Sequence, residues 1–334
     1  PEGAREAEEA MSRPILLGVN IDHAATLRQA RYRGAHASPH AEPSPLAFTR
    51  EALAGGADGG ERRGVVDAVI GAVALVVHLF DEDGRAFVAG QRVASLAGAT
   101  FEKRSPIDGR LLAPIADGQS ADIDVAVADA RSAFVGGVWS ARAPSARKRV
   151  LQRFAELIRT HKDELALLET LDMGKPIGDS LKVDVPSTAR CIEWYAEAID
   201  KIYGEVAPTS ASVLAPITRE PLGVVGAIVP WNFPLIMTAW KVAPILATGN
   251  SLVLKPSEKV PFSAIYFADL LYEAGLPPEM LSVITGDPRE IADEMLTHPS
   301  VDLITFTGGV AIGKYIANKA GYRRIVLELG GNDP

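Results

Sequence analysis

The chain has 334 residues, of which 47% are hydrophobic and 23% charged, and this is the composition of a folded protein with room for two domains. Its net charge of -8 argues against broad electrostatic binding to nucleic acid or anionic lipid, so we expect a small-molecule partner, with no nucleic acid and no membrane. The single cysteine, Cys191, excludes an internal disulfide and fits a reducing compartment, and the acidic N-terminus lacks an export signal, so we expect a cytoplasmic protein.

Residues 1–84 form a first zone in which short apolar runs alternate with loop-like stretches rich in Pro and Gly. The longest apolar run, Val69 to Val77, falls well short of the ~20 residues that cross a membrane, so it predicts a buried segment. We expect this zone to be an N-terminal extension that is separate from the domain of residues 85–334.

Short β-type segments are expected between Arg85 and Gly118, followed by an amphipathic helix, or two in succession, with Ser145 as its cap and Gly174 as its stop. A further helix is expected over CIEWYAEAIDKI. Residues 203–223 are strand-like and interrupted by prolines, which is typical of hairpin ends and edge strands.

From Ser251 onward short apolar strands alternate with helices of 10 to 15 residues, in the order SLVLK, PFSAIYFADLLYEAG, LSVITG, PREIADEMLTHP, DLITFTGG, AIGKYIANKAG and RIVLELGG. This alternation predicts right-handed β-α-β units on a parallel sheet that is covered on both faces. The expected fold class is therefore α/β, a Rossmann-like doubly wound parallel sheet. In such sheets, ligands bind at the carboxyl ends of the strands.

Gly308 and Gly309 lie between an expected strand and an expected helix. Bare backbone amides at a helix N-terminus favour an anion such as a phosphate, although a strand-to-helix turn without a ligand would also use this pair. The stretch Gly308 to Lys314 also matches the G-x-x-x-x-G-K pattern of nucleotide triphosphatases. Tyr315 follows where Ser or Thr would bind magnesium, which argues against that alternative.

Two further strand ends carry chemistry. Lys255 and Glu258 in KPSE offer an ammonium and acceptor oxygens that suit a ribose, or they are a solvated pair. In PWNFP, prolines hold an extended backbone around Asn232, whose carboxamide suits the stabilisation of an oxyanion. The alternative is a loop that merely packs its aromatic side chains.

Glu328 ends the last apolar strand, where we expect it to be half-buried. Desolvation there would raise its pKa towards a value suited to activating water. A structural role, as an acceptor for backbone amides, is equally compatible with the spacing. No metal site is predicted.

The ordered segments PWNFP, KPSE, FTGG and ELGG closely resemble the NAD(P)-dependent aldehyde dehydrogenase superfamily, over residues 85–334. The resemblance implies that Asn232 is an oxyanion donor and that Lys255 and Glu258 hold the adenosine ribose. It further implies that Pro230 and Trp231 line the cofactor cleft, that Gly308 and Gly309 approach the pyrophosphate, and that Glu328 is the general base.

In that family a cysteine thiolate attacks the aldehyde, hydride passes to nicotinamide, and activated water hydrolyses the thioester. Glu258 would repel a 2′-phosphate, so NAD is the expected cofactor, with NADP as the alternative. The aldehyde stays open, because LETLDMGKP to WYAEAIDKIYGEV is similar to γ-glutamyl-aminobutyraldehyde dehydrogenases and AGYRRIVLELGGNDP to phosphonoacetaldehyde enzymes. The stretch of residues 203–223 corresponds to the oligomerisation hairpin of the family, which implies a homo-oligomer.

Two departures from the family pattern affect function. Gly309 replaces a usual Ser, so a hydroxyl contact to the pyrophosphate is lost. The nucleophilic cysteine of the family lies downstream of ELGG, beyond Pro334, and Cys191 is expected to be a packing thiol. We therefore expect the chain by itself to be inactive. Asp172 and Lys175 are interpreted as turn residues around Gly174.

The N-terminal stretch Arg13 to Tyr32 resembles the opening of pyridoxine 5′-phosphate synthase, a (β/α)8 barrel. The positions that match its substrate contacts are Asn20, Asp22, His23 and Arg31, with GADG at 56–59 and His78 as further matches. At most two of the eight units of a barrel are present. Three functions therefore remain open, namely an aldehyde oxidoreductase, a nucleotide-binding module without catalysis, and a synthase fragment.

Overall fold

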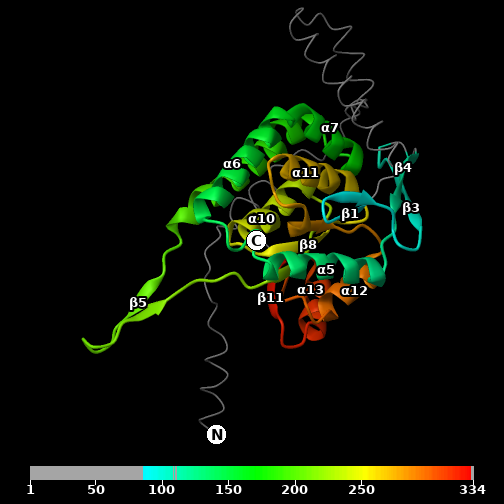
Figure 1. The fold of residues 1–334 in the computed structure, drawn as a ribbon. Helices are drawn as coiled ribbons and strands as arrows, with labels where there is room; N and C mark the ends of the chain where they lie inside the picture. The colour runs from blue at the N-terminus through cyan, green and yellow to red at the C-terminus, as the bar shows by residue number, and fades with distance from the viewer. Residues whose placement is uncertain (1–85, 108, 110, 332–334) are drawn as a thin grey trace, which may run out of the picture. The chain divides into compact units, whose positions relative to one another are not determined.

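The computed structural model describes residues 86–107, 109 and 111–331 (Figure 1). The described elements belong to one compact unit, Glu42–Gly330. The expectations for the N-terminal extension, including the apolar run at 69–77 and the synthase-like residues at 13–59 and 78, lie outside the described residues. The domain boundary at 84/85 therefore stays a prediction.

The central feature is a seven-stranded sheet in the order β11-β10-β7-β8-β9-β1-β2. The five strands from β11 to β9 are parallel, and β1 and β2 form an antiparallel edge. The strands are β1 (Ala86–Val88), β2 (Gln91–Val93), β7 (Val224–Ile228), β8 (Ser251–Lys255), β9 (Leu281–Val283), β10 (Leu303–Gly308) and β11 (Arg324–Leu329). The doubly wound parallel sheet is confirmed, but the antiparallel edge was not expected.

Helices cover both faces of this sheet (Figure 1). One layer packs against alternate residues of β7, β8 and β9 and consists of α6 (Pro144–Thr160), α7 (Lys162–Met173), α9 (Val185–Ala198), α10 (Pro234–Ala247) and α11 (Pro261–Glu273). The opposite layer consists of α5 (Ser120–Val135), α12 (Pro288–Thr297) and α13 (Val310–Lys319). Because both faces are covered, β7 and β8 are buried along their whole length and read as continuous apolar runs.

Local residue choices explain where the helices begin and end. The expected amphipathic segment consists of two helices, α6 and α7, which are separated at His161. Gly174 ends α7 in the left-handed conformation, with φ of 76°, as predicted. The prediction of Ser145 as the cap was wrong. The helix begins two residues earlier than that cap implies, because Pro144, with its fixed φ, occupies the first position and Ala143 is the cap residue.

The remaining elements connect these layers or extend from them. A two-stranded sheet is formed by β3 (Thr100–Arg104) and β4 (Leu111–Ala116). A second, formed by β5 (Glu205–Ala207) and β6 (Ala215–Ile217), is a hairpin that projects away from the helices (Figure 1). Four short helices complete the list of described elements, namely α8 (Ile177–Asp179), the π-helix η1 (Ser180–Asp184), η2 (Ile199–Lys201) and η3 (Pro278–Met280). None of the helices in the described ranges is long and apolar enough to cross a membrane.

Candidate functional site

The strand registers bring the predicted site residues to one edge of the sheet. Thr307 pairs with Glu328, Phe306 with Ile228, and Ile228 with Lys255, in four adjacent parallel strands. The segments that follow these positions carry Pro230 to Asn232, Glu258, and Gly308 to Gly309. Because the strands are parallel, all their carboxyl ends lie at the same edge, where ligands bind in this class of fold.

Lys255 is buried at the end of β8, with 2% of its surface exposed. Its ammonium donates to Glu258 Oε2 at 3.3 Å. Burial lowers the pKa of Lys255, and the negative charge of Glu258 acts in the opposite direction. The alternative of a solvated pair is therefore wrong for Lys255, because a buried ammonium needs acceptors within the site.

Gly308 ends β10, and Gly309 is the cap residue of α13. A Cβ added to Gly308 would lie 2.4 Å from Cζ of the buried Phe306, so this position needs glycine for close packing. A Cβ added to Gly309 meets no heavy atom within 4 Å. The space in front of the α13 N-terminus is therefore open, as an anion site requires.

The nucleotide triphosphatase alternative does not fit this geometry. Residues 310–314 are already helical, so the segment forms no loop that could wrap a chain of phosphates. Tyr315 also points its hydroxyl at Asp293, to which it donates at 2.6 Å. This contact explains the tyrosine as a link between α13 and α12.

The PWNFP segment leads from β7 into α10, with Phe233 as the cap residue. Trp231 is 51% exposed, whereas Phe233 is partly buried and packs on the core. The Lys175 ammonium lies 4.1 Å from the centroid of the Phe233 ring. One aromatic thus anchors the segment, and the other stays at the surface beside the exposed Asn232.

Glu328 has 41% of its side chain exposed and lies 3.5 Å from the ammonium of Lys241, measured from Oε1 to Nζ. Lys241 is buried in α10, and burial lowers its pKa while Glu328 acts in the opposite direction. The ion pair with Lys241 is a contact that neither of the two roles included, and both the general base and the acceptor for backbone amides stay predictions. The sequence reasoning missed Lys241, although a single charge in the apolar helix PLIMTAWKVAPILA is a visible signal.

Cys191 lies in α9 and packs against the larger core cluster. Burial raises the pKa of its thiol to about 12, so almost none of it is thiolate at neutral pH. Burial also raises the pKa of Tyr195, which lies in the same helix, and the charge of Glu328 adds to that effect. Cys191 therefore has the protonation of a packing thiol.

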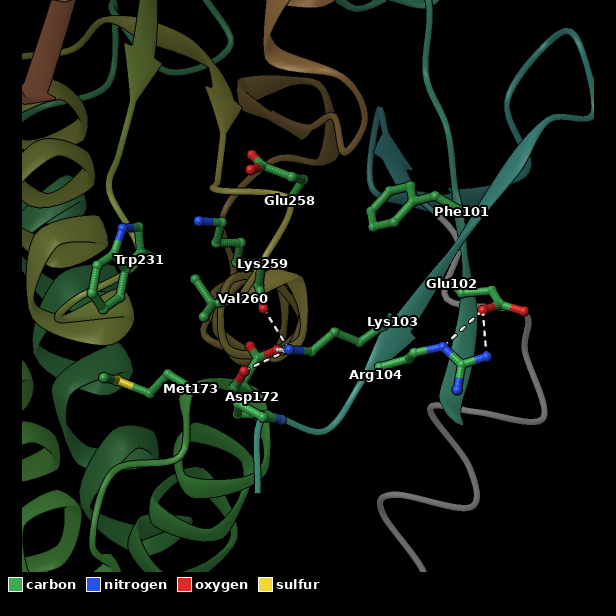
Figure 2. Close-up of a pocket in the computed structure, with 11 residues that line it drawn as sticks. Phe101, Glu102, Lys103, Arg104, Asp172, Met173, Trp231, Glu258, Lys259 and Val260 are labelled. Carbon is green, nitrogen blue, oxygen red and sulfur yellow. Dashed lines mark hydrogen bonds and ion pairs between the residues drawn. The ribbon is translucent and has the colours of Figure 1, made fainter. Parts of the chain in front are cut away.

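A pocket of about 490 Å³ lies between the β3 strand, the end of α7 and the turn after β8 (Figure 2). Two of the predicted residues, Trp231 and Glu258, line it together with Lys103, Asp172 and Lys259. The other predicted residues lie along the sheet edge outside this lining. Within the described ranges no cluster of three or more His, Cys, Asp or Glu side chains could hold a metal ion.

The interpretation of Asp172 and Lys175 as turn residues was incomplete. Asp172 is 1% exposed and Lys175 is 3% exposed, and both belong to buried ion pairs. Asp172 faces Lys103, and Lys175 donates to Asp184. No local signal predicts these pairs, because their partners lie on other elements.

Comparison with known proteins matches residues 93–334 to the aldehyde dehydrogenase family. The chain is 52% identical over 252 residues to the NADP/NAD-dependent aldehyde dehydrogenase PuuC of Escherichia coli (strain K12). This match covers 75% of this chain and 51% of PuuC. It is 42% identical over 264 residues to aminoacetaldehyde dehydrogenase of Pseudomonas aeruginosa, which covers 78% of this chain and 53% of that enzyme.

The chain also matches solved structures of aldehyde dehydrogenases. The γ-glutamyl-γ-aminobutyraldehyde dehydrogenase of Burkholderia cenocepacia J2315 superposes with a TM-score of 0.74 at 52% identity, covering 78% of this chain and 54% of that one. A mutant of the indole-3-acetaldehyde dehydrogenase AldA of P. syringae, in complex with NAD⁺ and IAA, superposes with a TM-score of 0.74 at 52% identity. The match covers 75% of this chain and 51% of that one. The chain spans about half the length of the relatives it matches. By this match, which extends over most of its residues, the chain belongs to the aldehyde dehydrogenase family.

Proposed function

We propose that this chain carries the cofactor-binding part of an NAD⁺-dependent enzyme that oxidises an aldehyde to a carboxylic acid. The observation that supports the proposal best is the parallel register that places Lys255, Gly308 and Glu328 at the carboxyl ends of three strands, around the end of β7 from which the segment with Asn232 begins. Residues 85–334 would form this cofactor domain, and residues 1–84 a separate extension. The aldehyde dehydrogenases PuuC and AldA are the relatives that make this the preferred function.

The residues at this edge fit a dinucleotide. The open space at Gly309 and the α13 N-terminus suit the pyrophosphate, Lys255 and Glu258 suit the adenosine ribose, and Pro230 and Trp231 would line the approach. When bound, NAD⁺ supplies the capacity to accept a hydride. Glu258 offers acceptor oxygens to ribose hydroxyls and repels a 2′-phosphate, so we expect NAD⁺ to bind more tightly than NADP⁺.

The chemical groups of the chain divide the remaining work. Asn232 would donate to the oxygen that becomes negative as the aldehyde carbon is attacked. Glu328 would accept a proton from water, and the Lys241 ammonium, 3.5 Å away, would hold the carboxylate in place. The nucleophilic thiolate is not assigned to Cys191, because burial raises the pKa of that thiol to about 12.

Calorimetric titration with NAD⁺ tests the proposal. We expect weak but saturable binding, which Glu258→Gln weakens about tenfold because a charge-assisted hydrogen bond to ribose is lost. The same variant removes the repulsion of a 2′-phosphate, so the affinity for NADP⁺ relative to NAD⁺ should rise. Glu279→Gln, an exposed carboxylate on η3, is the matched control. Absence of both binding heat and thermal stabilisation at millimolar NAD⁺ would contradict the proposal.

A further inference from the structure

A buried ammonium lies at the base of the pocket in Figure 2. Lys103, on β3, is 4% exposed. Its Nζ donates to the carbonyl oxygens of Asp172 and Lys259, each at 2.5 Å, and lies 3.3 Å from Oδ1 of Asp172. Two of the three donors of the ammonium make these hydrogen bonds, and Oδ1 of Asp172 balances its charge as an ion-pair partner. Burying a cation is unfavourable unless hydrogen bonds and an opposite charge compensate it in this way.

The carboxylate that faces Lys103 carries the connection onward to α11. Oδ2 of Asp172 accepts from the Ser263 amide at 3.0 Å and from the Ser263 hydroxyl at 3.3 Å. Burial raises the pKa of Asp172 to about 6, and Lys103 is the strongest influence in the opposite direction. The ammonium thus favours the charged carboxylate, and the carboxylate holds the first turn of α11.

These contacts fasten the turn between β8 and α11 on both sides of Val260. Lys103 holds the carbonyl of Lys259, and Asp172 holds the amide of Ser263. Within the turn, the Val260 amide donates to the carbonyl of Ser257 at 3.0 Å. Glu258 is therefore held from two sides. Its carboxylate pairs with the buried Lys255 at the end of β8, and the carbonyl of the next residue, Lys259, accepts from Lys103, which lies 156 positions earlier in the chain.

We propose that Lys103 is a positioning residue for cofactor recognition, because its ammonium fixes the β8–α11 turn so that Glu258 is held ready for the adenosine ribose. This inference rests on the proposed function. Lys103 itself touches no part of the cofactor in this assignment. The β3–β4 sheet that carries Lys103 is separate from the seven-stranded sheet, so this contact links a second sheet to the β8–α11 turn.

A positioning role and a merely structural role differ in one measurable ratio. If Lys103 positions Glu258, its loss should weaken the recognition of the ribose hydroxyl in particular. If Lys103 only stabilises the fold, its loss should weaken the binding of all nucleotides by the same factor. The ratio of the dissociation constants of 2′-deoxy-NAD⁺, which lacks the 2′-hydroxyl of the adenosine ribose, and NAD⁺ separates the two roles. The two ligands differ only at the hydroxyl from which Glu258 would accept a hydrogen bond.

The variant Lys103→Met keeps the length of the side chain and removes its donors. In titrations of the full chain, we expect the unmodified protein to prefer NAD⁺ over 2′-deoxy-NAD⁺ roughly tenfold, and Lys103→Met to bring this ratio close to one. Lys201→Met, which removes an exposed ammonium paired with Asp200, is the matched control and should keep the preference. A preference unchanged in Lys103→Met would overturn the positioning role and leave the proposed function intact.

A second variant covers a loss of folding. Lys103→Ala with added propylammonium replaces the missing three-carbon stem, charge and donors, so the fold, followed by circular dichroism, and the ribose preference should return together. A restored fold without a restored preference would overturn the inference. If the unmodified chain binds no NAD⁺ at all, the proposed function fails first and the inference fails with it.

Discussion

Three ionisable side chains, Glu169, Lys175 and Asp184, form a buried group next to Phe233 of the PWNFP segment. Glu169 is fully buried, and its Oε1 is 3.9 Å from the Lys175 ammonium. Lys175 donates to Asp184 and also lies over the ring of Phe233. Two buried carboxyl groups thus share one buried cation. Burial raises the pKa of Glu169 to about 8, and Lys175 opposes this rise while Asp184 adds to it.

Replacing Glu169 by Gln should change how stability depends on pH. The pKa of Glu169 is higher in the folded chain, about 8, than its ordinary 4.5, so the folded state binds the proton more tightly. This contribution to stability is complete below pH 4.5 and is lost as the pH rises through 8. Glutamine stays neutral and leaves the Lys175–Asp184 pair balanced. We expect Glu169→Gln to exceed the unmodified chain in unfolding free energy above pH 8, by on the order of a few kcal/mol.

Urea unfolding across this pH range measures the effect. In Glu169→Gln, the fall in unfolding free energy between pH 4.5 and 8 should be smaller than in the unmodified chain. Glu193→Gln is the control, because Glu193 is an exposed carboxylate that pairs with Arg159 on the surface. Parallel profiles for the unmodified chain and Glu169→Gln would show that Glu169 does not titrate in the folded protein.

The regular part of the fold was predictable from sequence because its signals are local. Strands such as β8, buried on both faces, appear as unbroken apolar runs, and each is followed by a helix with a proline or glycine at its boundary. The carboxyl-edge position of Lys255 and Gly308 follows from that alternation. Contacts between elements leave no such signal. Lys103 pairs with Asp172, and Lys241 with Glu328, only because the sheet and helices bring distant segments together.

The antiparallel edge shows the same limit for strands. The β-type character of AFV at β1 was visible, but its pairing with β9 at Phe87 and Val283 depends on the edge that the parallel strands leave open. Likewise, the break between α6 and α7 comes at His161, where the backbone leaves helical geometry without any proline or glycine. Sequence patterns therefore predict elements more reliably than the partners of those elements.

The β5–β6 hairpin exposes apolar side chains, and we propose that they pair with a second copy of the chain. Val206, Leu214 and Ile217 are 66%, 78% and 49% exposed, although strands usually bury such side chains. Replacing Val206 and Leu214 by Asp should convert an oligomer to monomers and leave NAD⁺ affinity unchanged, because the hairpin lies away from the sheet edge (Figure 1). Sedimentation velocity measures this, with Ser212→Asp as a control at the polar tip of the hairpin. A monomeric unmodified chain would contradict the expectation.

For the molecule as a whole, binding and turnover are separable properties. The residues that fit the cofactor are spread over β7, β8, β10 and β11 and need the complete sheet to meet. The nucleophile is a different requirement, because it needs a thiol that ionises near neutral pH. Cys191 is the one cysteine of the sequence, and burial raises the pKa of its thiol to about 12. The proposed binding of a dinucleotide and the thiol chemistry therefore depend on different groups, and the Cys191 thiol is not one that ionises near neutral pH.

We accordingly expect the 334-residue chain to bind NAD⁺ without forming NADH when aliphatic or amino aldehydes are added. NADH fluorescence measures turnover, and calorimetry on the same sample shows that the cofactor site is intact. Cys191→Ser should leave both results unchanged, since the thiol packs against the core and the hydroxyl occupies nearly the same volume. Robust aldehyde-dependent NADH formation that disappears in Cys191→Ser would show instead that this thiol is ionised and attacks the substrate. The comparison thus tests the protonation of one buried sulfur through the activity of the whole chain.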